Sequence, residues 1–330
     1  MAGKQSSISP SIPCNLCGGS EVEVIGNKGR DGKPLQSVIC LDCGLVWTDP
    51  RPGTEQMKQF YTDKYRVEYK AVVQPKLKHA YRETKRAIQR FERIRPLLVD
   101  GMKVLDVGAG GGFFPYVLKH RGYAVEGIEP NLGFAGYANQ QLEVDTHTGF
   151  VQDFAYAEGS FDIITLNHVL EHLEDPGAVL KRLFNWNRPG GYLNVEVPNI
   201  EATYHAPGHK FHRAHLYTFN PENLKLLGRK AGYQIYDLQL MAGTLHINVI
   251  FQKPAAPGPE PELTELRIRG NYSGINRVLI SHTPWRHYLS GKVYRRFFRK
   301  NLGYLKEILV VRRYSSGRTI ADYLISRHRD

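Results

Sequence analysis

Apolar and polar residues alternate along the middle of the chain in a pattern that predicts strands separated by helices. Short apolar runs typical of buried strands lie at 103–108, 124–129, 161–167 and 191–197. Segments with helical spacing of apolar residues lie at 113–122, 178–186 and 221–232. A turn at 189–191 precedes the strand at 191–197, and two further strands at 233–240 and 245–251 predict an antiparallel edge. The alternation predicts an α/β fold with a doubly wound, mostly parallel sheet.

Helical patterns flank this region on both sides. Residues 55–98 are expected to be helical, most strongly at 75–98, where Tyr81, Ile88 and Phe91 share an apolar stripe. Near the end of the chain, apolar residues recur every three or four positions: Trp285, Leu289, Val293, Phe297, Phe298, Leu302, Leu305 and Leu309. Basic residues fall among them, which predicts one or two amphipathic basic helices.

Two C-x-x-C pairs, each followed by a glycine, contain all the cysteines: Cys14, Cys17, Cys40 and Cys43. Alternating segments at 21–26 and 34–41, on either side of a turn at 31–33, predict a hairpin between the pairs. This spacing suits the four thiolate ligands of tetrahedral Zn²⁺ better than disulfides. We therefore expect a zinc ribbon with a structural Zn²⁺.

The net charge of +12 is concentrated in the last part of the chain. Residues 261–330 contain 15 Lys or Arg and 5 Asp or Glu, whereas the preceding part is nearly neutral, which argues against nucleic-acid binding by the ribbon. One expected partner of the tail is an anionic membrane surface or a lipid-phosphate-linked glycan; the alternative is that its stripe packs on the rest of the protein. No apolar run approaches the roughly 20 residues that span a bilayer, and no signal-peptide pattern is seen. We expect a cytoplasmic protein, with peripheral binding at the inner membrane face as a further option.

These features divide the chain into four expected parts. They are a zinc-binding ribbon module at 1–54, an α/β domain with its helical lead-in at 55–253, a proline-rich linker at 254–262 and a basic helical tail at 263–330. The linker is expected to be stiff, because closely spaced prolines favour an extended backbone.

A glycine-rich turn follows the first strand of the expected sheet. It contains Asp106, Gly108, Gly110 and Gly112 at alternate positions, and Phe113 stands where a dinucleotide-binding turn would have its third glycine. No Gly-Lys-Ser/Thr follows, which excludes a P-loop. A carboxylate beside the turn disfavours a pyrophosphate and suits a cationic ligand. The pattern favours S-adenosylmethionine, which carries a sulfonium and an ammonium group.

Residues 104–131 resemble the first two motifs of class I S-adenosylmethionine-dependent methyltransferases, and the resemblance continues to about residue 252. It implies a Rossmann-like fold with a seven-stranded sheet in the domain at 55–253. It also implies that the three glycines and Phe113 surround the methionine part of the cofactor, with Asp106 at its ammonium end. Glu129 would accept hydrogen bonds from the ribose hydroxyls, which a carboxylate can do with its two oxygens.

Further cofactor contacts follow from the same resemblance. Asp153 would accept from the adenine amino group with Phe154 stacked nearby, and Asn167 would lie at the end of the strand at 161–167, which is the fourth strand of the sheet in that family. Tyr65, together with Tyr61, would close over the cofactor. The alternative for Glu129 and Asp153 is a role as helix caps or solvated turn residues.

The expected base for methyl transfer lies in a histidine-rich segment after the fifth strand. The ribbon, the segment at 43–52 and this segment resemble sugar C-methyltransferases of bacteria, which implies His215 as the base, Tyr217 as a second catalytic residue and a sugar or glycan intermediate as the acceptor. His168 is a further catalytic candidate at the end of the fourth strand. Ala214 stands where that family has a glutamate, which leaves O-methylation open beside C-methylation.

Two other classes of function remain as alternatives. A nucleic-acid methyltransferase would use the ribbon and basic tail to grip phosphates, but the chain lacks an Asn-Pro-Pro-Tyr-like motif and its cysteines are committed to metal. A non-catalytic relative would only bind the cofactor or a partner, although the acidic residues at 106, 129 and 153 argue against it. A second metal bound by the histidine-rich segment is disfavoured, because no carboxylate lies within that segment.

Overall fold

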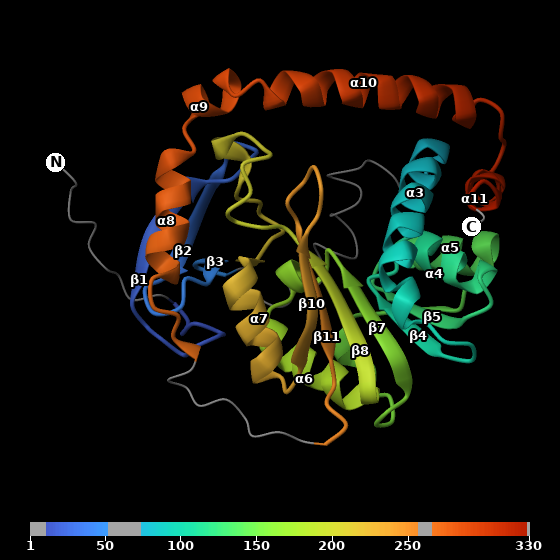
Figure 1. The fold of residues 1–330 in the computed structure, drawn as a ribbon, viewed down its shortest axis with the longest axis horizontal. Coiled ribbons are helices and arrows are strands. Elements are labelled where there is room, and N and C mark those ends of the chain that lie inside the picture. Colours follow the sequence, from blue (N-terminus) through green and yellow to red (C-terminus); the bar gives the residue numbers. More distant parts are fainter. Residues whose placement is uncertain (1–10, 52–73, 257–265, 329–330) are drawn as a thin grey trace. The chain divides into compact units, whose positions relative to one another are not determined.

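The computed structural model describes residues 11–51, 74–256 and 266–328, drawn as coloured ribbon in Figure 1. The chain divides into two compact units. The ribbon unit comprises Met1–Gly53 and Leu166–Val293, and the glycine-turn unit comprises Thr54–Thr165 and Tyr294–Asp330. The predictions for Tyr61 and Tyr65, for the first part of the helical lead-in and for most of the linker fall outside the described residues.

A seven-stranded sheet has the strand order β10-β11-β8-β7-β4-β5-β6. Its strands are β4 (Lys103–Val107), β5 (Ala124–Glu129), β6 (Thr146–Thr148), β7 (Phe161–Asn167), β8 (Asn187–Val197), β10 (Gln234–Leu240) and β11 (Ile247–Gln252). The pairs β4–β5 and β5–β6 are parallel, whereas β11 is antiparallel to both β8 and β10. The mostly parallel sheet is confirmed, and so is the antiparallel edge, because β10 and β11 pair antiparallel at one end of the sheet.

The expected turn at 189–191 is wrong, because β8 already begins at Asn187. The backbone N–H of Gly190 donates to the carbonyl of Lys253 over 2.9 Å, and the N–H of Lys253 donates to the carbonyl of Gly191 over 2.8 Å. These bonds continue the pairing of β8 with the end of β11. A glycine pair therefore forms part of the strand here, with Gly190 at a φ of 79°.

The helices of the glycine-turn unit are α3 (Leu77–Ile94), α4 (Phe113–His120), α5 (Leu132–Leu142), α11 (Gly317–Ser326) and most of α10 (Lys292–Val311), with 3-10 turns η2 (Arg95–Leu97) and η3 (Val151–Asp153). The apolar stripe of α3 is confirmed, because Tyr81, Ile88 and Phe91 are buried. Helix α11 buries Ile320 against this unit, and the hydroxyl of Tyr116 donates to Asp322 over 2.5 Å. The last helix of the chain is thus part of the unit's core.

The ribbon unit contains a second, four-stranded sheet with the order β1-β2-β3-β9. Its strands are β1 (Val22–Lys28), β2 (Pro34–Cys40), β3 (Val46–Thr48) and β9 (Tyr217–Thr218). The predicted hairpin is confirmed by the antiparallel pairing of β1 and β2. The helices of this unit are α6 (Pro176–Trp186), α7 (Pro221–Lys230), α8 (Asn271–Ser281) and α9 (Pro284–Leu289), with η4 (Leu170–His172) and η5 (Pro207–His209).

The described part of the basic tail forms four α-helices, and the stripe from Trp285 to Leu309, for which one or two helices were predicted, lies on two of them, α9 and α10. The stripe that begins at Trp285 is interrupted between α9 and α10, where Gly291 has a left-handed φ of 66°. Helix α8 packs in the ribbon unit: Ile275 lies in a core with Ile39 and Val46, and Asn271 donates to the carbonyl of Cys43 over 2.7 Å. The tail therefore divides between the two units.

Candidate active site

The glycine-rich turn connects β4 to α4 in the glycine-turn unit. Gly108, Gly110 and Gly112 have φ values of 78°, 59° and 77°, which lie in the left-handed region that favours glycine. A Cβ at Gly112 would lie 2.6 Å from the Cβ of Ala138 on α5. The alternating glycines are therefore required by the backbone of the turn and by its close approach to a neighbouring helix.

Glu129 is joined to this turn by hydrogen bonds. Its carboxylate accepts from the N–H of Gly110 over 2.8 Å and from the N–H of Asn131 over 3.0 Å, through different oxygens, and the residue is 3% exposed. Both carboxylate oxygens are thereby held in fixed positions beside the turn. The residues thus fit the ribose part of the expected cofactor, because a carboxylate can accept hydrogen bonds from both ribose hydroxyls.

Asp106, on β4, is buried, and its carboxylate accepts from the hydroxyl of Thr165 over 2.6 Å. Phe113 is the first residue of α4, and its ring is buried beside Tyr137 with ring centroids 5.9 Å apart. Contacts of both residues with a cofactor stay predictions.

Asp153 has the local structural role that the sequence left open as its alternative. Its carboxylate accepts from the N–H of Phe150 over 3.2 Å and caps the short helix η3. The ring of Phe154 stacks on Tyr156 at 6.4 Å between centroids. Capping does not exhaust a carboxylate's acceptor capacity, so the expected contact of Asp153 with adenine stays a prediction.

In the ribbon unit, His168 lies between two carboxylates directly after Asn167, the last residue of β7. Its Nδ1 is 3.3 Å from Glu171 Oε1, and its Nε2 is 3.0 Å from Glu196 Oε1. Burial alone lowers the pKa of His168, but the two carboxylates outweigh burial and raise the pKa to about 9. His168 is therefore an imidazolium at neutral pH, bound at both nitrogens, which makes it unsuitable as a proton acceptor.

The backbone of His168 is also unusual. Its φ of 59° lies in the left-handed region, which non-glycine residues rarely adopt. Its backbone N–H donates to the carbonyl of Glu196 over 2.8 Å, and the ring of His246 lies edge-on at 4.8 Å between centroids. Strained residues held in place by several contacts are concentrated at functional sites.

Glu171 connects this cluster to His215. Glu171 is 1% exposed, and single nitrogen and oxygen atoms of Glu171, His172 and His215 lie within 4.8 Å of one another. Burial raises the pKa of the Glu171 carboxyl, but the neighbouring imidazoles, His172 and His168 foremost, outweigh it and lower the pKa to about 2. Glu171 therefore carries a negative charge at all working pH values.

His215 is neutral at pH 7. Burial, together with the positive charge that His172 can carry, holds the pKa of His215 well below its usual value, although Glu171 opposes the shift. The ring of His172 lies edge-on to His215 at 4.9 Å, and its Nδ1 donates to the carbonyl of Ala214 over 2.7 Å. A neutral imidazole beside a buried carboxylate can take up a proton.

His212 supports His215 from the other side. Its ring lies 4.9 Å from that of His215, and its Nδ1 accepts the backbone N–H of Ala214 over 2.9 Å. Burial, followed by the charge of Arg30, lowers the pKa of His212 to about 4. His212 is thus a neutral, buried side chain in the wall of the site.

Tyr217 is fully buried on β9, and its phenol is held by the ribbon unit. Its hydroxyl contacts the guanidinium of Arg51, which also lies 4.4 Å above the ring, and it donates to the carbonyl of Glu174 over 3.3 Å. Burial raises the pKa of Tyr217, and Arg51 opposes the shift only in part. The phenol stays protonated, so a catalytic part for Tyr217, still a prediction, is limited to donating a hydrogen bond.

The four cysteines converge in the ribbon. Their Sγ atoms lie within 4.8 Å of one another and all four side chains are buried, with 3.5 Å separating both Cys14 from Cys43 and Cys17 from Cys40. Gly18 follows the first C-x-x-C pair with a φ of 73°. Such a donor set fits a tetrahedral, thiolate-bound metal.

The ribbon is fastened to the chain near His215. Strand β3 pairs with β9, so that Trp47 lies opposite Tyr217, and the hydroxyl of Thr48 donates to the carbonyl of His215 over 3.2 Å. On the other side of the ribbon, Lys230 of α7 donates to the carbonyls of Asn15 and Leu16 over 2.8 and 2.9 Å. The ribbon therefore supports the backbone that carries His215.

Sequence reasoning missed three members of this cluster: Glu171, Glu196 and His246. A signal existed for Glu196, because a glutamate in the apolar strand VEVP is a charged residue where burial is expected. Glu171 lies in η4, which precedes α6. Helix α6 is capped by Asp175, whose carboxylate accepts from the N–H of Ala178 over 2.9 Å.

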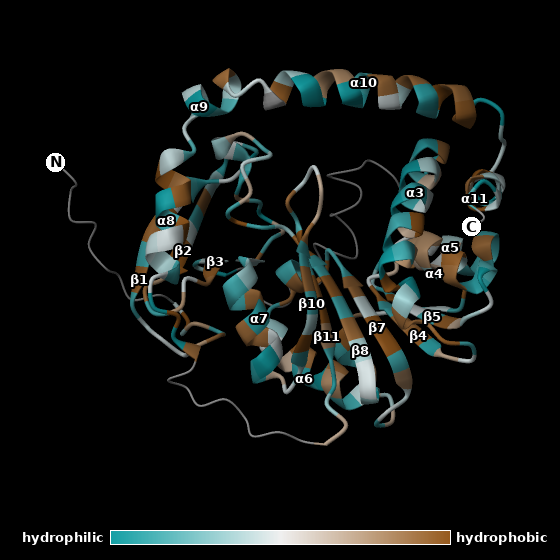
Figure 2. Ribbon diagram, viewed as in Figure 1, coloured by the Kyte–Doolittle hydropathy of each residue, from teal (hydrophilic) through white to brown (hydrophobic). Residues whose placement is uncertain are grey.

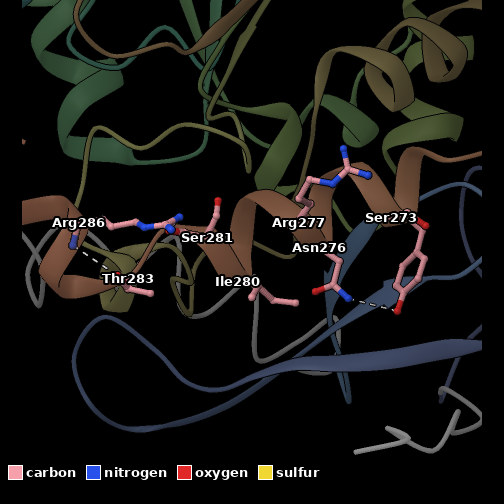
Figure 3. A pocket seen from close by; sticks show the side chains of 8 residues that line it. Ser273, Asn276, Arg277, Ile280, Ser281, Thr283 and Arg286 are labelled. Carbon is pink, nitrogen blue, oxygen red and sulfur yellow. Dashed lines mark hydrogen bonds between the residues drawn. The ribbon is translucent and has the colours of Figure 1, made fainter. Parts of the chain in front are cut away.

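An open pocket of about 600 Å³ lies beside α8 and α9 (Figure 3). Its lining includes Asn276, Arg277 and Ile280, and the guanidinium of Arg286 donates to the carbonyl of Ser281 over 3.3 Å. None of the predicted site residues lines it. The candidate chemistry therefore does not involve this pocket.

Residues 77–238, from α3 into β10, match a family model described as a methyltransferase domain. This part of the chain is similar to methyltransferase domains. The matched range covers the glycine turn, Glu129, Glu171 and His215. It supports a class I S-adenosylmethionine-dependent methyltransferase enzyme, as the residues at 104–131 indicated.

Curated proteins that are similar to part of this chain are named as methyltransferases. The ubiquinone biosynthesis O-methyltransferase of Aromatoleum aromaticum is 31% identical over 138 residues, which are 37% of this chain and 59% of that protein. The protein of the same name from Pseudomonas entomophila is 36% identical over 107 residues, which are 30% of this chain and 45% of that protein. The chain thus spans about half the length of these relatives.

Solved methyltransferases are similar at a lower level. The 1,6-didemethyltoxoflavin-N1-methyltransferase of Burkholderia thailandensis is 19% identical with a TM-score of 0.45, and the likeness covers 66% of this chain and 97% of that chain. A structural similarity this low supports no conclusion about the reaction or the substrate.

Proposed function

We propose that this protein transfers a methyl group from S-adenosylmethionine to a small-molecule acceptor. The observation that carries the proposal is the pair of hydrogen bonds that hold the Glu129 carboxylate beside the glycine turn. These residues lie within the range that matches the methyltransferase family model. When bound, S-adenosylmethionine supplies an electrophilic methyl group. The turn would hold its methionine part, Glu129 its ribose and Asp153 its adenine.

His215 is the proposed base. It is neutral at pH 7 because burial and His172 disfavour its charged form, and Glu171 would stabilise the imidazolium that forms when it accepts a proton. The acceptor's acidic O–H or C–H must come within hydrogen-bond reach of this ring. His168, charged at neutral pH between Glu171 and Glu196, acts by fixing Glu171 rather than by accepting a proton.

The acceptor is proposed to be a small molecule with a hydroxyl group. The curated relatives are named O-methyltransferases, which favours transfer to oxygen. A sugar or glycan intermediate, and transfer to carbon, are the narrower proposals that rest on the resemblance of the ribbon and of the segment around His215. We also propose that the basic tail brings the enzyme to an anionic surface where a lipid-linked intermediate would be available.

The cysteine cluster is proposed to hold one structural Zn²⁺. Four buried thiols in mutual contact fit this ion, and with all four positions occupied by cysteine no ligand position is open for catalysis. The ion would fold the ribbon, and the ribbon supports the backbone at His215 through Thr48. The metal would therefore affect methyl transfer by folding the ribbon that supports the backbone at His215.

The decisive experiment measures cofactor binding and turnover separately. Calorimetry with S-adenosylhomocysteine tests the glycine turn, and mass spectrometry of phenolic, sugar and nucleotide-sugar acceptors incubated with S-adenosylmethionine tests transfer. We expect binding that Glu129→Ala removes, with Glu158→Gln, an exposed glutamate of the same unit, as the control. Wild-type protein that is folded and binds neither form of the cofactor would contradict the proposal.

A further inference from the structure

Helix α10 presents an apolar face to solvent. The exposed residues of this face are Tyr294, Phe297, Phe298, Leu302, Leu305, Ile308 and Leu309, with exposed fractions between 45% and 67%. At 100° per residue they fall within an arc of about 140° around the helix axis. Figure 2 shows hydrophobic and hydrophilic residues alternating along this helix. The stripe is a surface of the folded protein and does not pack on its core.

The opposite side of α10 anchors the helix to the glycine-turn unit. Glu307 is 7% exposed, and its carboxylate accepts two hydrogen bonds from Arg82 of α3, over 2.5 and 2.9 Å. The guanidinium of Arg82 also lies 4.9 Å from the ring centre of Tyr304. On a helical projection Glu307 lies about 150° or more from the centre of the apolar arc. The attachment thus fixes which face of α10 points outward.

Basic residues border the apolar arc. Arg295, Lys306 and Arg299 follow one another along one edge, and Lys300 lies beyond the other edge. All four are exposed, and the acidic residue of this helix, Glu307, is taken up by Arg82. An apolar stripe with basic borders complements the boundary between acyl chains and anionic headgroups.

We propose that α10 is an in-plane membrane-binding helix, which inserts this face into the surface of an anionic lipid bilayer. The proposal rests on the proposed contact of the basic tail with an anionic surface and not on methyl transfer. It assigns that contact to one helix and one face. A second copy of the chain fits less well, because apposed α10 helices would bring basic borders together. No helix in the described ranges is long and apolar enough to cross a bilayer.

The test is flotation of the full-length protein with vesicles of phosphatidylcholine, with and without about 30% phosphatidylglycerol. We expect binding to the acidic vesicles alone. It should weaken as the salt concentration rises from about 0.1 M to about 1 M, because the Debye length falls from about 10 Å to about 3 Å. Absence of binding to acidic vesicles, or equal binding to neutral ones, would overturn the proposal.

Two double variants assign the binding to this face. Phe298→Ser/Leu305→Ser removes apolar surface from the middle of the arc and should lower the partition coefficient at least about tenfold. The control Leu132→Ser/Ile280→Ser changes two residues of similar exposure, 74% and 71%, on α5 and α8 and should bind as the wild type does. Equal losses in both would overturn the assignment to α10.

Charge is tested in the same way. Arg295→Glu/Arg299→Glu should abolish binding to acidic vesicles, whereas Arg269→Glu/Arg277→Glu, at exposed positions near and on α8, should retain most of it. Unchanged melting temperature and unchanged S-adenosylhomocysteine affinity show that the variants are folded. The proposal would be overturned if the protein did not bind vesicles but formed a concentration-dependent dimer that Phe298→Ser/Leu305→Ser abolishes. The apolar face of α10 would then bind a second copy of the chain. Because no cofactor is needed for flotation, its outcome is independent of the methyltransferase assay.

Discussion

The hydroxyl of Thr48 donates a hydrogen bond to the backbone carbonyl of His215 over 3.2 Å, although 167 residues separate them in the chain. This bond continues the pairing of β3 with β9, in which the N–H of Thr48 donates to the carbonyl of Leu216 over 3.0 Å. The cysteine ribbon therefore determines where the backbone of the proposed base lies. A module that takes no part in the chemistry can influence it by this route.

Thr48→Val tests this support directly. The variant keeps the side-chain shape but removes the hydroxyl, so it should destabilise the protein by about 1 kcal/mol and lower kcat while leaving cofactor affinity unchanged. The control is Thr84→Val on α3, because Thr84 is also buried but its hydroxyl makes no hydrogen bond to any of the residues that the structure describes. Urea unfolding and steady-state kinetics measure both. A kcat as high as that of the wild type would refute the coupling.

Removal of the metal should lower stability and methyl transfer by more than Thr48→Val does. Cys43→Ser, or treatment with a strong chelator, should lower the melting temperature and methyl transfer together, while S-adenosylhomocysteine still binds to the glycine-turn unit. Metal content by mass spectrometry should be one equivalent of zinc in the wild type. Full activity of metal-free protein would show that the ribbon does not position His215.

The sequence predicted the local elements well, and the reason is physical. Strands 124–129 and 161–167 have the bounds predicted for them, because continuous apolar runs between turn residues suffice to define a buried strand. The cluster around Glu171 could not be predicted in this way. Glu171 and His215 are brought together by η4 and β9, and no periodicity in the sequence records a contact over 44 residues.

The sequence disfavoured a second metal because the histidine-rich segment contains no carboxylate. In the fold, Glu171 of η4 lies beside His215 of that segment, and this contact between distant residues could not be seen in the sequence. The strand pairing of β3 with β9 was equally hidden, because a two-residue strand leaves no pattern in the sequence. Long-range pairing decides which local elements form the site.

His215→Ala should lower kcat by about 10²- to 10⁴-fold, the usual contribution of a positioned base, with unchanged affinity for S-adenosylhomocysteine. His209→Ala is the matched control, since His209 is an exposed histidine of the same segment. Radiolabelled methyl transfer and calorimetry provide the two measurements. Turnover of the variant at the wild-type rate would remove His215 from the proposed mechanism.

The charge of Glu171 should be visible in the pH profile. Because Glu171 raises the pKa of His215 against the effect of burial, Glu171→Gln should move the acid limb of kcat/KM to lower pH. The pKa of His168 should fall from about 9 in the same variant, because one of its two carboxylate partners is neutralised. NMR titration of the imidazole nitrogens measures this independently of activity. An unchanged His168 pKa would contradict the assigned contacts.

His168 should also make stability depend on pH in a defined direction. Its pKa is raised from 6.5 to about 9 on folding, so its contribution is fully present below pH 6.5 and is lost as the pH rises through about 9. The loss amounts to at most about 3 kcal/mol, at 1.36 kcal/mol for each pKa unit. Replacement by Gln should remove this part of the pH dependence, which is read as the difference between the unfolding free energies of wild type and His168→Gln from pH 6 to pH 10. Comparing the two proteins cancels other groups that titrate in the same range, such as Lys210, whose pKa burial lowers to about 8. A difference that stays constant across this range would mean that His168 is not held as a cation between Glu171 and Glu196.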